Sequence, residues 1–262
     1  MRFADKTALV TGGGTGIGAA VARRLRAEGG NVIVMGRRLA PLERVAAATG
    51  AIAFTGDAAS GEDVRRAVAI ATERFGGLDV LVANAGGHGF GTAAEMDDAA
   101  WASSTRVNLD TAFVSARETL PALQDRRGNI VIVSSLAGLF AGPQVVGYVT
   151  MKHALIGLTR SITRDFGPLG VRCNAVCPGW VRTDMADDEM KVLIDQHKLA
   201  SLDEAYRLVT RNVPLRRPAE PEEVAGVICF LASQEATMVT GAVVPIDGGA
   251  SAVDLPTIAF AD

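Results

Sequence analysis

The sequence predicts an α/β fold, a doubly wound parallel sheet of about seven strands with helices on both faces. Three observations predict it. Short apolar runs alternate with helical segments, the runs are rich in β-branched residues without polar alternation, and a glycine-rich turn follows the first run. Strands that are apolar on both sides belong to parallel sheets covered on both faces. A length of 262 residues without a composition break favours a single domain over residues 1–262.

The expected elements follow from the periodicity of the apolar residues. The strands are expected at Thr7–Thr11, Asn31–Met35, Ala51–Phe54, Val80–Ala83, Asn129–Ser134, Val171–Val176 and Val243–Ile246. The helices are expected at Ile17–Glu28, Pro41–Ala48, Gly61–Phe75, Asp97–Leu120, Gly147–Phe166 and Glu220–Leu231. The long Asp97–Leu120 helix should end at Pro121, because proline lacks the N–H that continues a helix. The irregular residues 182–214, here called the lid segment, are long enough to predict a substrate lid at the edge of the sheet.

The composition argues against several classes of protein. Hydrophobic residues make up 48% of the chain and the formal net charge is −3, so the chain can form a core and has no strongly basic surface. No run approaches about 20 uninterrupted apolar residues, and residues 1–6 lack the apolar segment of a signal peptide. The three cysteines suit neither a disulfide framework nor a zinc site. We therefore expect a cytoplasmic protein that binds no nucleic acid, membrane or metal.

A glycine-rich turn joins the first expected strand to the first expected helix. Glycine lets backbone N–H groups approach a phosphate closely, and the helix N-terminus adds a favourable dipole. Three residues separate Gly12 from Gly16, where the common dinucleotide fingerprint has one, and Ile17 and Gly18 follow. Thr15 adds a hydroxyl to the turn. The turn therefore predicts a dinucleotide site, with a merely flexible turn as the alternative.

The end of the second expected strand indicates which dinucleotide binds. An acid at this place would accept a hydrogen bond from the ribose 2′-hydroxyl of NAD(H). The sequence instead has Gly36 there, followed by Arg37 and Arg38. Guanidinium groups bind a 2′-phosphate by charge-assisted hydrogen bonds. NADP(H) is therefore favoured, and NAD(H) remains possible if the two arginines only face solvent.

Tyr148 and Lys152 are four residues apart in an expected helix, so they share one face. A fixed ammonium one turn away favours the phenolate, which predicts that the pKa of Tyr148 moves down towards the neutral range. The pair alone is common on exposed helices. However, Ser135 follows the Asn129–Ser134 strand, 13 residues before Tyr148, at the edge of the sheet where ligands bind. Ser134 should point to the other side of the strand and have a structural role.

Taken in order from Thr7 to Gly249, these motifs resemble those of the short-chain dehydrogenase/reductase family. The resemblance implies a Rossmann-type fold and a reversible hydride transfer between a nicotinamide and a carbonyl/alcohol pair. It implies that Tyr148 is the acid and base, that Ser135 binds the substrate oxygen, and that Lys152 binds the nicotinamide ribose. Asn108 matches the helix asparagine that supports a water in the proton relay.

The resemblance also implies which residues hold the cofactor. Asp57, followed by Ala58, matches the acid at the adenine edge, and Thr183 matches a contact to the nicotinamide carboxamide. Ala83 stands where the family more often has a first asparagine. The implied cofactor-binding residues are Gly12, Thr15, Gly16, Ile17, Gly18, Arg37, Arg38, Asp57, Ala58, Asn84, Ala85, Gly86, Tyr148, Lys152, Pro178, Gly179, Val181 and Thr183.

The substrate is less defined by the sequence. The expected pocket residues are His88, Phe90, Ala137, Gln144, Trp180 and Met185. His88 could instead be a solvent-exposed loop residue, and Trp180 could pack beneath the lid segment. The region after Cys177 is similar to 3-oxoacyl-carrier-protein and polyketide ketoreductases, which implies a β-ketoacyl substrate.

Other classes of function remain open at this stage. One alternative is an NAD(H)-dependent dehydrogenase of a small or cyclic secondary alcohol, and another is a catalytically idle NADP-binding regulatory protein. An extended epimerase or dehydratase fits the glycine spacing and the length less well. The resemblance also implies a homo-oligomer, a tetramer or a dimer. The tail of residues 250–262 is expected to pack either on a neighbouring subunit or on its own sheet.

Overall fold

The computed structural model describes residues 1–260 and contains one parallel sheet of seven strands in the order β3-β2-β1-β4-β5-β6-β7. The predicted fold class is confirmed, and each strand begins within one residue of its expected start. The strands are β1 Thr7–Thr11, β2 Asn31–Gly36, β3 Ile52–Thr55, β4 Val80–Ala83, β5 Asn129–Val133, β6 Arg172–Pro178 and β7 Val243–Ile246.

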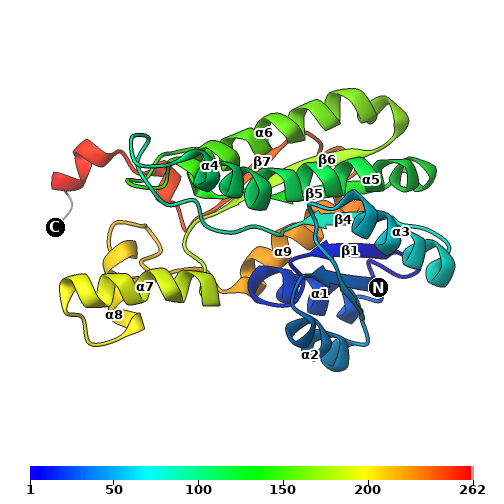
Figure 1. The fold of residues 1–262 in the computed structure, drawn as a ribbon, viewed down its shortest axis with the longest axis horizontal. Helices are drawn as coiled ribbons and strands as arrows, with labels where there is room; N and C mark the ends of the chain where they lie inside the picture. Colours follow the sequence, from blue (N-terminus) through cyan, green and yellow to red (C-terminus); the bar gives the residue numbers. More distant parts are fainter. Residues whose placement is uncertain (261–262) are drawn as a thin grey trace.

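Helices cover both faces of this sheet (Figure 1). The main helices are α1 Gly16–Ala27, α2 Leu39–Thr49, α3 Gly61–Phe75, α4 Asp98–Thr105, α5 Thr111–Arg126, α6 Val146–Phe166, α7 Asp184–His197, α8 Leu202–Thr210 and α9 Pro221–Ala232. Alternate residues of each strand point to opposite faces. Val10 of β1 therefore packs on the side of α1, α2 and α9, whereas Leu9 packs on the side of α3, α5 and α6.

The expected helix from Asp97 to Leu120 is wrong in its continuity and in its end. A single π-helical turn, η1 (Arg106–Asp110), separates α4 from α5, and α5 continues through Pro121 to Arg126. Pro121 lies on the exposed face of α5, where water can bind the carbonyl that loses its N–H partner. Leu120 and Leu123 on the inner side of α5 are buried, and this packing outweighs the local cost of the proline.

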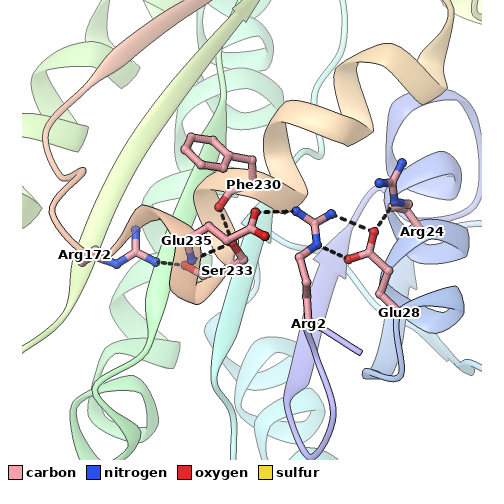
Figure 2. Close-up of polar contacts among 7 residues, drawn as sticks. All are labelled: Arg2, Arg24, Glu28, Arg172, Phe230, Ser233 and Glu235. Atoms are coloured by element: carbon pink, nitrogen blue, oxygen red, sulfur yellow. Dashed lines mark hydrogen bonds and ion pairs between the residues drawn. The ribbon is translucent and has the colours of Figure 1, made fainter.

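A network of ion pairs holds the chain together at the edge where the strands begin. Arg2 donates to both carboxylate oxygens of Glu28, which follows α1, at 2.6 and 2.7 Å. Its third nitrogen donates to Glu235, beyond α9, at 3.0 Å (Figure 2). Arg24 also pairs with Glu28. The hydrogen bond from Arg2 holds the pKa of Glu28 below its usual value, and burial opposes this effect only in part. The network therefore links the N-terminal segment to two helices.

The lid segment contains α7 and α8, which stand apart from the sheet in Figure 1. They pack on each other through a small core that includes Met190 and Tyr206, both fully buried. Further along the chain, Leu255 and Phe260 are 76% and 88% exposed. The alternative that the tail covers its own sheet is therefore wrong for residues 255–260, and residues 261–262 lie outside the described part. No helix among residues 1–260 is long and apolar enough to cross a membrane.

Candidate active site

The predicted site residues gather where the strands of the sheet end. Four loops meet at this edge because they follow β1, β4, β5 and β6, whose carboxyl ends all point the same way. They carry the glycine-rich turn, the segment from Asn84 to Phe90, the serine pair Ser134 and Ser135, and the residues after Pro178. The first turns of α6 add Tyr148 to the same place.

Tyr148 and Ser135 lie side by side, and the Ser135 hydroxyl interacts with the Tyr148 side chain. The Oγ atom of Ser135 also accepts a hydrogen bond from the backbone N–H of Ala137 at 3.1 Å, which fixes its position. Burial raises the pKa of Tyr148, and the Ser135 hydroxyl offsets this only in part. The expectation of a lowered pKa for Tyr148 is therefore wrong, because burial outweighs the hydrogen bond from Ser135. Tyr148 is protonated at neutral pH.

Lys152 is buried behind Tyr148. Its Nζ atom lies 5.4 Å from the centroid of the Tyr148 ring and donates to the Val133 carbonyl oxygen at 3.1 Å. Burial lowers the pKa of Lys152 to about 8. Ser134 donates from Oγ to the Lys152 carbonyl oxygen at 2.8 Å and is buried, which confirms its structural role.

Asn108 lies in the π-helical turn η1 and faces the loop after β4. Its Oδ1 atom accepts from the Gly87 N–H at 3.0 Å, and its Nδ2 atom donates to the carbonyl oxygens of His88 and Ser104, each at 3.2 Å. A Cβ atom added to Gly86 would lie 3.4 Å from Asn108 Oδ1 and 3.6 Å from Lys152 Nζ. Asn108 and Lys152 therefore face the same small space beside Gly86.

The N-terminus of α1 is open to an anion. Thr15 precedes the helix but its side chain makes no capping hydrogen bond. Among residues 1–260, the N–H groups of Gly16, Ile17 and Gly18 have no hydrogen-bond partner. A phosphate is a suitable partner for such N–H groups. Gly16 and Ile17 are the first two residues of this turn. This arrangement fits the diphosphate of a dinucleotide.

The glycines of the turn are required by close backbone packing. Gly12 has a φ of +63°, and a Cβ atom on Gly18 would clash with the Gly12 carbonyl oxygen. It would also lie 2.7 Å from Asn84 Nδ2. Asn84 donates from Nδ2 to the carbonyl oxygens of Thr11 and Gly12 at 3.0 and 3.2 Å, so it braces the end of β4 against the turn. Ala85 donates its N–H to the Thr11 hydroxyl at 3.1 Å.

The predicted adenosine side of the site carries charged residues from three segments. Arg37 and Arg38 are exposed directly after β2. Asp57 accepts from Arg106 at 2.7 Å and from the Ala59 N–H at 2.9 Å. Burial alone would raise the pKa of Asp57, but these hydrogen bonds and the charges of Arg106 and Arg37 hold it below its usual value. No local sequence signal indicated the contribution of Arg106, which comes from η1.

The segment after β6 is held in place by the scaffold. Gly179 donates its N–H to the Ile246 carbonyl oxygen at 3.0 Å, and Val181 forms a parallel β-bridge with Ala219. Ala58, which lies on the adenosine side of the site, is buried. Thr183 accepts from the Ala186 N–H at 3.3 Å and so caps α7. Its methyl group would lie 3.0 Å from a Cβ atom on Gly16, which places this segment against the glycine-rich turn.

The six residues predicted for the substrate pocket do not form one group. His88 and Phe90 stack with their ring centroids 4.7 Å apart, and Trp180 packs against the core of the lid segment. Trp180 also lines a cavity of about 110 Å³ together with Leu136. Gln144 takes part through its backbone, with its carbonyl oxygen accepting from Gly91 at 2.8 Å.

The two other residues predicted for the substrate pocket are Met185 and Ala137. Met185 is 41% exposed on the first turn of α7, and the N–H of Ala137 is used by Ser135. Sequence reasoning missed Glu189 of α7, whose Oε1 atom lies 3.5 Å from Nδ1 of His88. An acid within a polar helical segment has no distinguishing sequence signal.

Comparison with known proteins identifies the class of this chain. Residues 12–251 match the family model described as enoyl-(acyl carrier protein) reductase. Protein MoaE of Klebsiella aerogenes is 48% identical over 98% of this chain and 99% of its own length. Meso-2,3-butanediol dehydrogenase of Serratia marcescens is 35% identical over 97% of this chain and 98% of its own. The chain belongs to the short-chain dehydrogenase/reductase family, oxidoreductases of alcohols and ketones that bind a nicotinamide cofactor.

A solved structure agrees with this assignment. Actinorhodin polyketide ketoreductase with NADPH aligns with a TM-score of 0.87 and 34% sequence identity, covering 93% of this chain and 96% of that one. The likeness to ketoreductases that the sequence indicated is thus found in a solved structure as well.

Proposed function

We propose that this protein is an NADP(H)-dependent oxidoreductase that interconverts a ketone and a secondary alcohol, with Tyr148 as the acid and base. The observation that carries the proposal is the placement of Tyr148 beside Ser135, with the buried Lys152 on the same helix face. This is an arrangement in which a protonated phenol and a hydroxyl can both donate to one carbonyl oxygen.

The fit of the cofactor rests on the uncapped N-terminus of α1 and on the close packing of the glycine-rich turn. When bound, the nicotinamide supplies or accepts the hydride. The preference for NADP(H) is supported by the exposed Arg37 and Arg38 after Gly36, where no carboxylate would repel a 2′-phosphate. The actinorhodin ketoreductase structure, which contains NADPH, also supports it.

The roles of the side chains follow from their positions. In the direction of reduction, Ser135 and Tyr148 donate hydrogen bonds to the carbonyl oxygen, and Tyr148 then gives up its proton as negative charge develops there. The raised pKa of Tyr148 keeps the phenol protonated, which is the form this step needs. The ammonium of Lys152 stabilises the phenolate that results. Asn108 faces the same space as Lys152 and would hold the water that returns the proton.

Two classes of substrate are supported. A β-ketoacyl thioester is supported by the likeness to the actinorhodin ketoreductase. A small secondary alcohol or diol is supported by the 35% identity to meso-2,3-butanediol dehydrogenase. We further propose that the protein is cytoplasmic and that it forms a homo-oligomer. The second proposal is supported by Trp101 of α4 and Phe113 of α5, large apolar side chains that are 41% and 45% exposed. Light scattering measures the oligomeric state directly.

The proposal is tested by titrating the purified protein with NADPH and with NADH, followed by turnover with ketones and β-ketoacyl thioesters. Tighter binding of NADPH, reduced by Arg37→Ala but not by Arg160→Ala on the outer face of α6, supports the cofactor assignment. Equal binding of NADH would show that Arg37 is a surface residue. Binding of NADPH without turnover of any ketone would favour the idle regulatory protein.

A further inference from the structure

Glu189 joins the lid segment to the loop after β4. It lies on α7, and its side chain is 34% exposed, so it is neither fully solvated nor fully buried. Its Oε1 atom is 3.5 Å from Nδ1 of His88, which follows β4. A distance of 3.5 Å is at the outer limit of a hydrogen bond, so the carboxylate keeps capacity to accept a better donor.

The loop that carries His88 reaches the predicted reaction centre, because the carbonyl oxygen of the adjacent Gly89 accepts from the backbone N–H of Tyr148 at 3.3 Å. Glu189, which lies against His88, is therefore placed near this centre. It acts electrostatically on Tyr148, where it adds to burial in raising the pKa of the phenol. Burial likewise raises the pKa of Glu189 itself, and His88 offsets part of this. A carboxylate that pays for partial desolvation without a strong partner is a local cost that ligand binding can relieve.

The neighbours of Glu189 favour a particular kind of ligand group. Phe90 stacks on His88, so an apolar ring covers the histidine that lies against the acid. The adjacent Asp188 is different, because it pairs with Lys191 at 2.7 Å and its side chain is 67% exposed. Of these two consecutive acids, Glu189 is therefore the one that turns toward the loop after β4.

We infer that Glu189 is a specificity-determining residue that selects substrates with a hydrogen-bond donor, a hydroxyl or an ammonium group, close to the reacting carbonyl. This inference rests on the proposed function. The acid would accept a hydrogen bond from the donor group while Tyr148 and Ser135 hold the carbonyl oxygen. A substrate with a carboxylate at the same place would be repelled.

The test uses four ketones that differ in one group: butan-2-one, 1-hydroxypropan-2-one, 1-aminopropan-2-one and acetoacetate. Their kcat/KM values with NADPH are measured for the wild type, for Glu189→Gln and for the control Asp188→Asn. We expect the wild type to favour the hydroxyl and ammonium compounds over butan-2-one. We expect Glu189→Gln to reduce this preference about 10- to 100-fold, most for the ammonium, and to improve acetoacetate.

Several results would overturn the inference without affecting the proposed function. One is an equal loss for all four ketones in Glu189→Gln, which indicates a structural role. Others are an unchanged preference, or the same loss of preference in Asp188→Asn, which indicates a diffuse negative field. Turnover of butan-2-one by the wild type reports the oxidoreductase activity independently of these comparisons.

If the wild type turns over none of these four ketones, binding decides the inference, and the thioester assay above decides the proposed function. Calorimetry of the NADPH-saturated protein then compares butan-2-one with 1-aminopropan-2-one. Tighter binding of the amine that Glu189→Gln abolishes supports a donor site at Glu189. Equal binding of the two compounds overturns it.

Discussion

Replacing Arg2 by methionine is expected to lower the stability of the whole domain. The change keeps an apolar stem but removes the guanidinium that donates to Glu28 at 2.6 and 2.7 Å and to Glu235 at 3.0 Å. Hydrogen bonds to charged groups contribute about 1.5–3 kcal/mol when buried, and exposed ion pairs about 0.2–1 kcal/mol. The Arg2 and Glu28 side chains are 27% and 16% exposed, between these two cases. We expect a loss of about 1–2 kcal/mol, or about 2–8 °C in Tm.

The loss of stability in Arg2→Met is expected to depend on pH. The pKa of Glu28 is lowered by Arg2, so the pair stabilises the folded state above the ordinary value of 4.5 and loses this effect as the pH falls. Urea unfolding of the wild type and Arg2→Met should therefore differ most near neutral pH and converge below pH 4.5. Arg24→Met is the control, because its side chain is 50% exposed and its ion pair is with Glu28, not with Glu235. Equal stability of wild type and Arg2→Met at pH 7 would refute this reasoning.

Three further predictions concern the site. Gly18→Ala should abolish NADPH binding measured by fluorescence, because the added Cβ atom would clash with the Gly12 carbonyl oxygen. Retained affinity would show that the turn adapts and would contradict this reasoning. The rate of ketone reduction should fall above about pH 8 as Lys152 loses its proton. Lys152→Arg stays charged, so its pH–rate profile should not show this fall. The same fall in the variant would exclude Lys152 as its source. Tyr206→Phe removes a 2.7 Å hydrogen bond to Asp187. The loss of about 1 kcal/mol in local stability should speed hydrogen exchange in α7 and α8 by about fivefold. Unchanged exchange would contradict this.

The sheet could be predicted from the sequence because its strands are apolar on both faces. Runs such as Asn129–Val133 have no polar alternation and cannot be mistaken for exposed strands. The motif residues were also readable, since Tyr148 and Lys152 need only helical spacing to share a face. The sequence could not show that α5 passes through Pro121, because that depends on which side of the helix faces solvent.

The parts of the site that escaped prediction depend on contacts between distant segments. Arg106 reaches Asp57 only because η1 lies beside the loop after β3. Glu189 meets His88 only because α7 folds over the loop after β4. The raised pKa of Tyr148 has the same origin, since the burial that raises it is a property of the assembled site. Local spacing carries none of this information.

The most direct test of the central claim follows deuterium from NADPH labelled at both C4 hydrogens into the product alcohol. The account predicts one deuterium on the carbinol carbon for each NADPH oxidised by the wild type. It also predicts that Tyr148→Phe slows this transfer by about 10²- to 10⁴-fold while NADPH still binds. A Phe variant as active as the wild type, or product alcohol that carries no label, would contradict it.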